Sequence, residues 1–179
     1  MRDVRVPGDV VLGPKGGGPA HHKVFRDSEA PQNYRSVIAL ERYLNKVRLR
    51  RSSSAHADLF PKAVKIVRQR QSRNIPDISF ADEPLVLTQS DMDRSNFAVD
   101  TAGRPVILDF GEIGWLPKSL GLFTLLNTTG FARVVSEHLF TPEGSAVLRA
   151  QPNLKSIAAV KGLLGIAARP CFGTFTHRF

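Results

Sequence analysis

The stretch that decides the fold spans residues 85–117 and has the sequence LVLTQSDMDRSNFAVDTAGRPVILDFGEIGWLP. It contains two short apolar runs, 97–100 and 105–108, which have the length and composition of β-strands. The residues between them include Gly103, and glycine is typical of hairpin turns. The stretch therefore predicts a β-hairpin near the middle of the chain.

Three polar residues flank this hairpin: Asp91 and Asn96 precede it, and Asp109 follows it directly. A symmetric pairing of the strands sets Phe97 opposite Leu108 and therefore Asn96 opposite Asp109. Directly opposed residues of an antiparallel pair lie about 4.5–5.5 Å apart, so we expect both side chains to reach one cation. Magnesium needs few protein oxygens, so Asn96 and Asp109 are predicted metal ligands.

Asp91 lies at the mouth of the same loop and is not needed for this metal pair. Its carboxylate is predicted to orient or deprotonate an acceptor hydroxyl, while Asn96 and Asp109 hold Mg²⁺ on the phosphates of ATP. Each motif alone also has a structural interpretation, because Asp and Asn often cap turns. The two motifs in this order, joined by a hairpin, favour a kinase-like phosphoryl-transfer site.

The stretch 85–117 resembles the catalytic core of the aminoglycoside phosphotransferase-like family, in particular its large fungal branch. The family loop usually runs His-Gly-Asp-x-x-x-x-Asn, and here Gln89 and Ser90 replace the residues that normally brace it by hydrogen bonds. Asp93 adds a carboxylate where the family often has His. The second motif, 109–117, is similar to the family's Ile-Asp-Phe/Trp-Gly/Glu, which is often followed by Ala-Gly-Trp-x-Pro.

The resemblance implies an α+β, mostly helical protein: the large (C-terminal) lobe of a protein-kinase-like fold with a short catalytic β-hairpin. It implies phosphoryl transfer from ATP, with Mg²⁺, to a hydroxyl of a small molecule. In this interpretation Asp91 is the catalytic residue, and Asn96 and Asp109 are the metal ligands. The nucleotide and a small-molecule acceptor are then the binding partners.

A kinase-like enzyme also needs a small lobe with a glycine-rich flap and a strand lysine, and residues 1–90 contain no clear match to either. The segment 13–18 is rich in glycine, but it lacks the Gly-Lys-Ser/Thr ending of a nucleotide loop and is predicted to be a surface connector. We expect three regions: an irregular segment over 1–35, a kinase-like large lobe over 36–168 with its catalytic core at 85–117, and a tail over 169–179. The alternative is a truncated, non-catalytic, pseudokinase-like binding or interaction module.

Apolar periodicity predicts a helix that starts after Ser36, and a second helix near Asp58. Phe110 and Trp115 are expected in the core. Further helices are predicted over 120–126, 134–140, 144–149 and 156–166, with connectors over 52–54 and 71–84.

The net charge of +9 makes an anionic partner a possibility, through basic residues concentrated at 42–51 and 62–73. No nucleic-acid-binding signature is present, so specific nucleic-acid binding is not expected. No apolar run has the roughly 18–20 residues of a membrane span, and no secretory signal is recognised, so a cytoplasmic location is expected. His21 and His22 lack the spacing of metal ligands.

Overall fold

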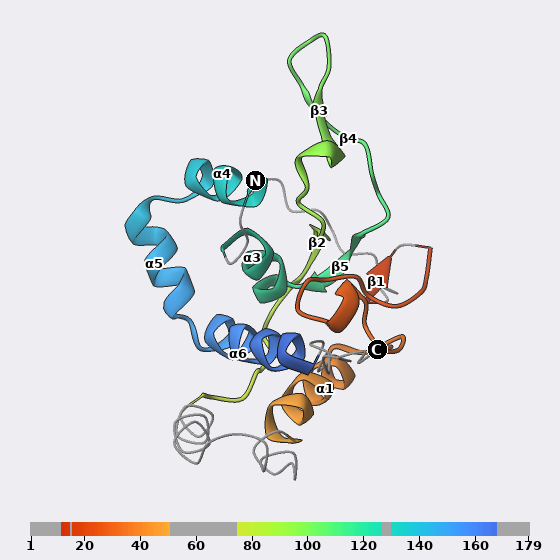
Figure 1. Cartoon of the computed structure of the whole chain (residues 1–179), viewed down its shortest axis with the longest axis vertical. Helices are drawn as coiled ribbons and strands as arrows, with labels where there is room; N and C mark the ends of the chain where they lie inside the picture. Colours follow the sequence, from red (N-terminus) through yellow and green to blue (C-terminus); the bar gives the residue numbers. More distant parts are fainter. Residues whose placement is uncertain (1–11, 15, 51–74, 127–129, 168–179) are drawn as a thin grey trace, which may run out of the picture.

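The computed structural model describes residues 12–14, 16–50, 75–126 and 130–167, which form an α+β protein (Figure 1). The described elements, in chain order, are β1 (Gly13–Pro14), η1 (Arg26–Ser28), α1 (Val37–Arg50), β2 (Leu85–Gln89), η3 (Arg94–Asn96), β3 (Phe97–Val99), β4 (Pro105–Ile107), β5 (Ile113–Pro117), α3 (Lys118–Leu126), α4 (Phe131–Leu139), α5 (Pro142–Ala150) and α6 (Pro152–Ala167).

The strands form two separate antiparallel sheets. β5 is the central strand of the first sheet, with β1 on one side and β2 on the other. The register of β2 and β5 sets Leu85 opposite Pro117 and Gln89 opposite Ile113. β3 and β4 form a hairpin that projects away from the helices (Figure 1). The chain therefore leaves the first sheet at Gln89 and returns at the paired position, Ile113.

The predicted hairpin is present, but the predicted register is wrong by one residue. Phe97 pairs with Ile107, not with Leu108. The N–H of Leu108 donates a hydrogen bond to the carbonyl oxygen of Asn96 over 2.9 Å, so Asn96 lies opposite Leu108 and not opposite Asp109. The expected cross-strand metal pair is therefore not formed by this ladder.

The turn explains the shift in register. The N–H of Asp100 donates to the carbonyl oxygen of Arg104 over 2.9 Å, so these two residues face each other and only 101–103 form the loop. Gly103 has a φ of +78°, the left-handed conformation that closes three-residue hairpin loops. The prediction assumed a four-residue turn, and losing one loop residue moves every cross-strand pair by one position.

The hydrophobic core lies where α3 packs on β2 and β5, and where α6 packs against α1, α3 and α5. α1 begins after Ser36 as predicted, and the Oγ of Ser36 accepts a hydrogen bond from the N–H of Ala39 over 3.2 Å. Its residues Leu40 and Leu44 are completely buried, which confirms the apolar face predicted for this helix. A helix is also present at each of the four later predicted sites.

The described part of the predicted connector 71–84 has neither helix nor strand, yet Ile78 and Phe80 are buried in the core. Side chains of α1 replace the missing backbone partners. Asn45 donates to the carbonyl oxygen of Ile78 and accepts from its N–H, both over 2.9 Å. Glu41 accepts from the N–H of Phe80 over 2.8 Å. These bonds fix an extended segment whose polar backbone would otherwise be buried unpaired.

The described part of 1–35 also belongs to the core, and His22 attaches it to α3. The His22 side chain is completely buried. Its Nδ1 accepts a hydrogen bond from the N–H of Val24 over 3.0 Å, so the neutral ring carries its proton on Nε2. Nε2 lies 3.0 Å from the carbonyl oxygen of Leu120 and 2.9 Å from Oγ1 of Thr124. His22 therefore has a structural role.

Part of the expected glycine-rich connector is a strand. Gly13 and Pro14 form β1 and pair with Trp115 and Gly114 of β5. The two backbones approach so closely that a Cβ atom on Gly114 would lie 2.6 Å from the carbonyl carbon of Gly13. A residue with a side chain at position 114 would therefore push β1 away from the sheet.

The expectation that Phe110 is a core residue is wrong, because 65% of it is exposed. It lies in the loop that returns from the hairpin to β5, outside the contact between the sheet and α3. Trp115 is half-buried on β5. The helix predicted near Asp58 lies outside the described residues. No helix in the described ranges is both long enough and apolar enough to cross a membrane.

The buried imidazole of His22 predicts a loss of stability in mild acid. Burial, opposed in part by the hydrogen bond to Leu120 and reinforced by Lys161 and Lys23, lowers the pKa of His22 from 6.5 to about 4. The unfolded chain therefore binds the extra proton first. The contribution of His22 is complete above pH 6.5 and is lost as the pH falls towards 4, by about 3 kcal/mol in the free energy of unfolding.

Urea unfolding at several pH values between 7 and 4 measures this effect. His22→Asn is the matched variant, because its Oδ1 can accept the Val24 N–H but does not titrate. We expect a smaller pH dependence of the unfolding free energy in the variant between pH 6.5 and 4. Equal slopes for the two proteins would contradict the prediction.

Candidate functional site

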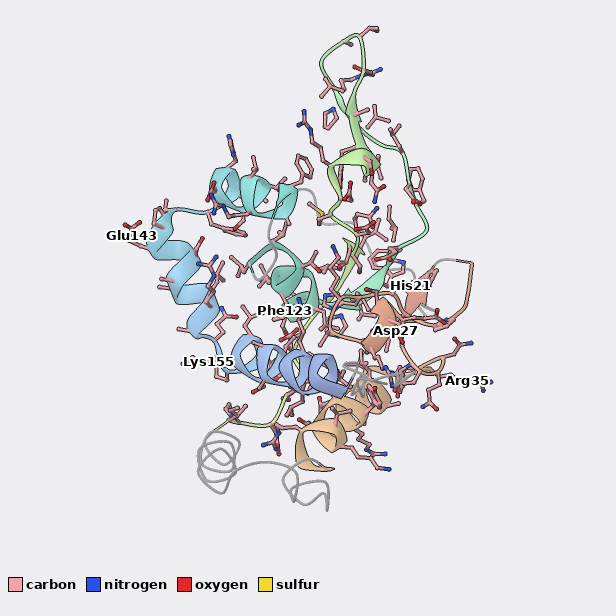
Figure 2. The ribbon with its side chains drawn as sticks, viewed as in Figure 1. His21, Asp27, Arg35, Phe123, Glu143 and Lys155 are labelled. Carbon is pink, nitrogen blue, oxygen red and sulfur yellow. The ribbon has the colours of Figure 1, made fainter. Side chains whose placement is uncertain are left out.

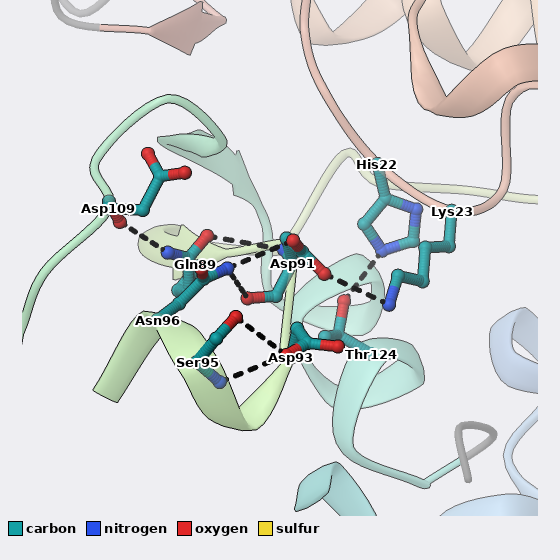
Figure 3. Close-up of polar contacts among 9 residues, drawn as sticks. All are labelled: His22, Lys23, Gln89, Asp91, Asp93, Ser95, Asn96, Asp109 and Thr124. Atoms are coloured by element: carbon teal, nitrogen blue, oxygen red, sulfur yellow. Dashed lines mark hydrogen bonds and ion pairs between the residues drawn. The ribbon is translucent and has the colours of Figure 1, made fainter. Parts of the chain in front are cut away.

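The loop after β2 brings Asp91 and Asn96 together. Asn96 is buried, and its Nδ2 donates to Oδ2 of Asp91 over 2.9 Å and to the Asp91 carbonyl oxygen over 3.2 Å (Figure 3). The turn of 3₁₀ helix η3 closes this loop and ends at Asn96, which sets the direction of the amide. The carboxylate of the predicted catalytic residue is therefore fixed by the predicted metal ligand.

Asp93 has a local role in the same loop. It is the N-cap of η3, and its Oδ1 accepts hydrogen bonds from the N–H of Ser95 over 2.9 Å and from the Ser95 hydroxyl over 2.7 Å. These bonds lower the pKa of the exposed Asp93 carboxyl. The additional carboxylate noted in the sequence therefore stabilises the shape of the loop.

Gln89 connects the two halves of the site. Its Oε1 accepts a hydrogen bond from the N–H of Asp91 over 3.2 Å, and its Nε2 donates to the carbonyl oxygen of Asp109 over 2.8 Å (Figure 3). Gln89 replaces a residue that normally braces this loop in the family that 85–117 resembles. In the structure Gln89 itself supplies hydrogen bonds of that kind, because an amide both donates and accepts.

Asp109 is joined to the site through its backbone and not through its carboxylate. Its exposed side chain accepts a hydrogen bond from the N–H of Gly111 over 2.7 Å. Figure 3 shows the Asp109 carboxylate on the far side of the Gln89 amide from Asp91 and Asn96. The structure therefore brings two of the three predicted site residues into contact, and it holds the third nearby with its carboxylate turned away.

Lys23 is a further site residue that the sequence did not indicate. Its Nζ lies 3.3 Å from Oδ1 of Asp91, and 35% of each side chain is exposed. Lys23 directly follows the buried His22, so the anchor on α3 also brings the lysine to the loop (Figure 3). No local pattern links Lys23 with Asp91, because the two lie far apart in the sequence.

Glu112 is a second site residue that sequence reasoning missed. Burial raises the pKa of its carboxyl, and the carboxylates of Asp91 and Asp109 raise it further, against the opposing effect of His21 and Lys23. The Oε2 atom of Glu112 is buried and has no hydrogen-bond partner among the described residues. The acidic residue directly after the Asp-Phe-Gly motif was the available signal.

Ser90 lies beside Glu112 on the same strand pair. The N–H of Ser90 donates to the carbonyl oxygen of Glu112 over 3.0 Å, which continues the ladder of β2 and β5 by one position. Opposed residues in such a ladder place their side chains on one face of the sheet. In the described part of the chain, the Oγ of the fully buried Ser90 also lacks a hydrogen-bond partner, so this face carries two polar atoms that are unsatisfied there.

The basic surface predicted for an anionic partner is only partly described. On α1, Arg42 and Lys46 are exposed. Arg48 instead donates to the carbonyl oxygen of Ile75 over 3.0 Å and forms an ion pair with Asp77. It therefore fixes the connector to α1, while the basic segment 62–73 lies outside the described residues.

Neither a cluster of metal ligands nor a similar known protein identifies the function of this site. Within the described ranges, no three or more His, Cys, Asp or Glu side chains are grouped so that they could hold a metal ion. The chain matches no protein-family model, no curated protein and no solved structure. A functional assignment therefore depends on the site geometry and on the sequence motifs.

The side-chain amide of Gln89 links the loop before the hairpin to the loop after it, so we expect its removal to destabilise this region. Gln89→Leu has a similar volume but cannot form either hydrogen bond, so we expect the unfolding free energy to fall by about 1–2 kcal/mol. Hydrogen exchange at the Asp91 amide should become faster. Gln151→Leu is the control, because Gln151 is exposed at the end of α5.

An Asp91 amide that exchanges equally fast in Gln89→Leu and the wild type would show that the bridge does not hold the loop. Comparison with Gln151→Leu separates this effect from the general effect of an added apolar side chain.

Proposed function

We propose that this chain is the large lobe of a kinase-like phosphotransferase, which binds ATP with Mg²⁺ and phosphorylates a hydroxyl of a small molecule. The observation that carries the proposal is the hydrogen-bonded connection from Asp91 through Gln89 to Asp109. This connection holds the two motifs against each other although a complete hairpin separates them in the sequence. The resemblance of 85–117 to the aminoglycoside phosphotransferase-like family supports the same assignment.

Asp91 is the residue assigned to the acceptor. In the proposed reaction the acceptor oxygen forms a bond to the γ-phosphorus of ATP, and the bond from that phosphorus to the bridging oxygen breaks. ADP leaves with the electron pair of the broken bond, and the carboxylate of Asp91 accepts the hydroxyl proton. Asn96 supports this role, because its amide fixes the carboxylate of Asp91 in one orientation.

The donor chemistry of Asn96 and Asp109 suits magnesium, which prefers hard oxygen ligands. Asn96 donates from Nδ2 to Asp91, so its Oδ1 is the side-chain atom assigned to the ion. Asp109 uses Oδ1 for the N–H of Gly111, which leaves Oδ2. Because Asp109 is exposed, its side chain can turn without disturbing the core. When bound, magnesium supplies positive charge to the phosphates.

The second candidate function is a non-catalytic binding or interaction module of kinase-like ancestry. The observation in its favour is that the Asp91 carboxylate is already engaged by Lys23 and Asn96 while the Asp109 carboxylate is turned away. Such a module would retain the fold of the lobe and would not transfer a phosphoryl group.

Calorimetric titration with ATP and Mg²⁺ separates the two candidates. We expect saturable binding by the wild-type chain and binding at least about tenfold weaker in Asp109→Ala, because a contact with a charged group contributes roughly 1.5–3 kcal/mol. Asp82→Ala, which removes an exposed carboxylate from another part of the surface, should bind like the wild type.

A wild-type chain that is folded by circular dichroism but does not bind the nucleotide would exclude the phosphotransferase and leave the binding module. If binding occurs, Asp91→Asn should retain it and lower phosphoryl transfer by about 10²–10⁴-fold, the usual range for loss of a general base.

A further inference from the structure

Lys23 stands out because it brings a positive charge to a site made mainly of carboxylates. Its ammonium contacts Asp91, and its charge also lowers the pKa of Asp93 and opposes the rise in the pKa of Glu112. Asp109 acts on the same Glu112 carboxyl, so four acidic side chains share this region. Among the described residues, Lys23 is the cation paired with Asp91.

A polyphosphate cannot approach four carboxylates without positive charge, and stabilisation of charge is the main source of catalysis in phosphoryl transfer. Magnesium held by Asn96 and Asp109 would supply part of that charge. A lysine beside the catalytic carboxylate is suited to supply more, because an ammonium group binds phosphate oxygens as a point charge.

The surroundings of Lys23 hold its backbone firmly. Val24 and Phe25, which follow it, are buried, and His22, which precedes it, is fixed by hydrogen bonds to Leu120 and Val24. The lysine side chain itself remains about one-third exposed. A rigid backbone with an accessible ammonium group is the arrangement expected of a preorganised anion contact.

The ion pair between Lys23 and Asp91 is also weak enough to exchange. Exposed and partly exposed ion pairs contribute only about 0–1 kcal/mol to stability. Little free energy is therefore lost when the Lys23 ammonium leaves a carboxylate oxygen for a phosphate oxygen. The exchange would also release the Asp91 carboxylate to accept the hydroxyl proton.

We propose that Lys23 binds the terminal phosphate of the nucleotide. This inference rests on the proposed phosphotransferase function and adds one contact to it, between the Lys23 ammonium and the terminal phosphate. A lysine with a purely structural role would instead hold the 20–25 segment on the loop after β2. The two roles differ in whether the effect depends on the number of phosphates.

Calorimetric titrations with ATP, ADP and AMP, each with Mg²⁺, test the proposal. In Lys23→Met we expect about tenfold weaker binding of ATP and less than about twofold weaker binding of AMP, since one charge-assisted contact to the terminal phosphate is lost. Lys23→Arg should recover part of the ATP affinity. Lys155→Met, at an exposed lysine of α6 (Figure 2), is the control and should bind like the wild type.

Equal ATP affinity in Lys23→Met and the wild type would overturn the inference and leave the proposed function standing. Equal losses for ATP and AMP would overturn it in favour of the structural role. A folded wild-type chain that binds no nucleotide would overturn both the proposed function and this inference. If Lys23→Met does not fold, the neutral and more polar Lys23→Gln takes its place in the same comparison.

Discussion

The pairing of Gln89 with Ile113 in the ladder of β2 and β5 is the constraint on which the candidate site depends. Because the two residues face each other, the chain between them must leave and return at one end of the sheet. The loop before the hairpin and the loop after it therefore meet. Gln89 then uses both ends of its amide to hold Asp91 and Asp109 in place. The register of β2 and β5 brings the two loops together, and the hydrogen bonds of Gln89 then fix their positions.

The N-terminal segment contributes Lys23 to the site, and the buried imidazole of His22 positions this segment. His22 takes its hydrogen-bond partners from its own segment and from α3, and burial keeps it neutral. The next residue, Lys23, consequently emerges beside Asp91. The stability of the core and the charge of the site are thus coupled, because the residue that anchors the segment directly precedes the residue that supplies the cation.

Much of the local structure was predictable because it depends on short-range patterns. The cap at Ser36, the apolar spacing of Leu40 and Leu44, and the existence of the hairpin all follow from neighbouring residues. The register did not follow, because it depends on whether Gly103 closes a three-residue or a four-residue loop. A difference of one loop residue places Asn96 opposite Leu108 and not opposite Asp109.

The sequence by itself determined the α+β character of the chain, the α-helices that the structure describes, and the identity of the candidate polar residues Asp91, Asn96 and Asp109. These features are encoded by periodicity and by residue chemistry over short distances. Only the tertiary structure decided which of the three share contacts, and that Lys23 and Glu112 join them. The contact between Asp91 and Asn96 depends on how the loop after β2 closes through η3. The contacts of Asp91 with Lys23 and of Gln89 with Asp109 link residues far apart in the chain, and the packing around the central strand β5 that brings these residues together is not encoded in any local pattern.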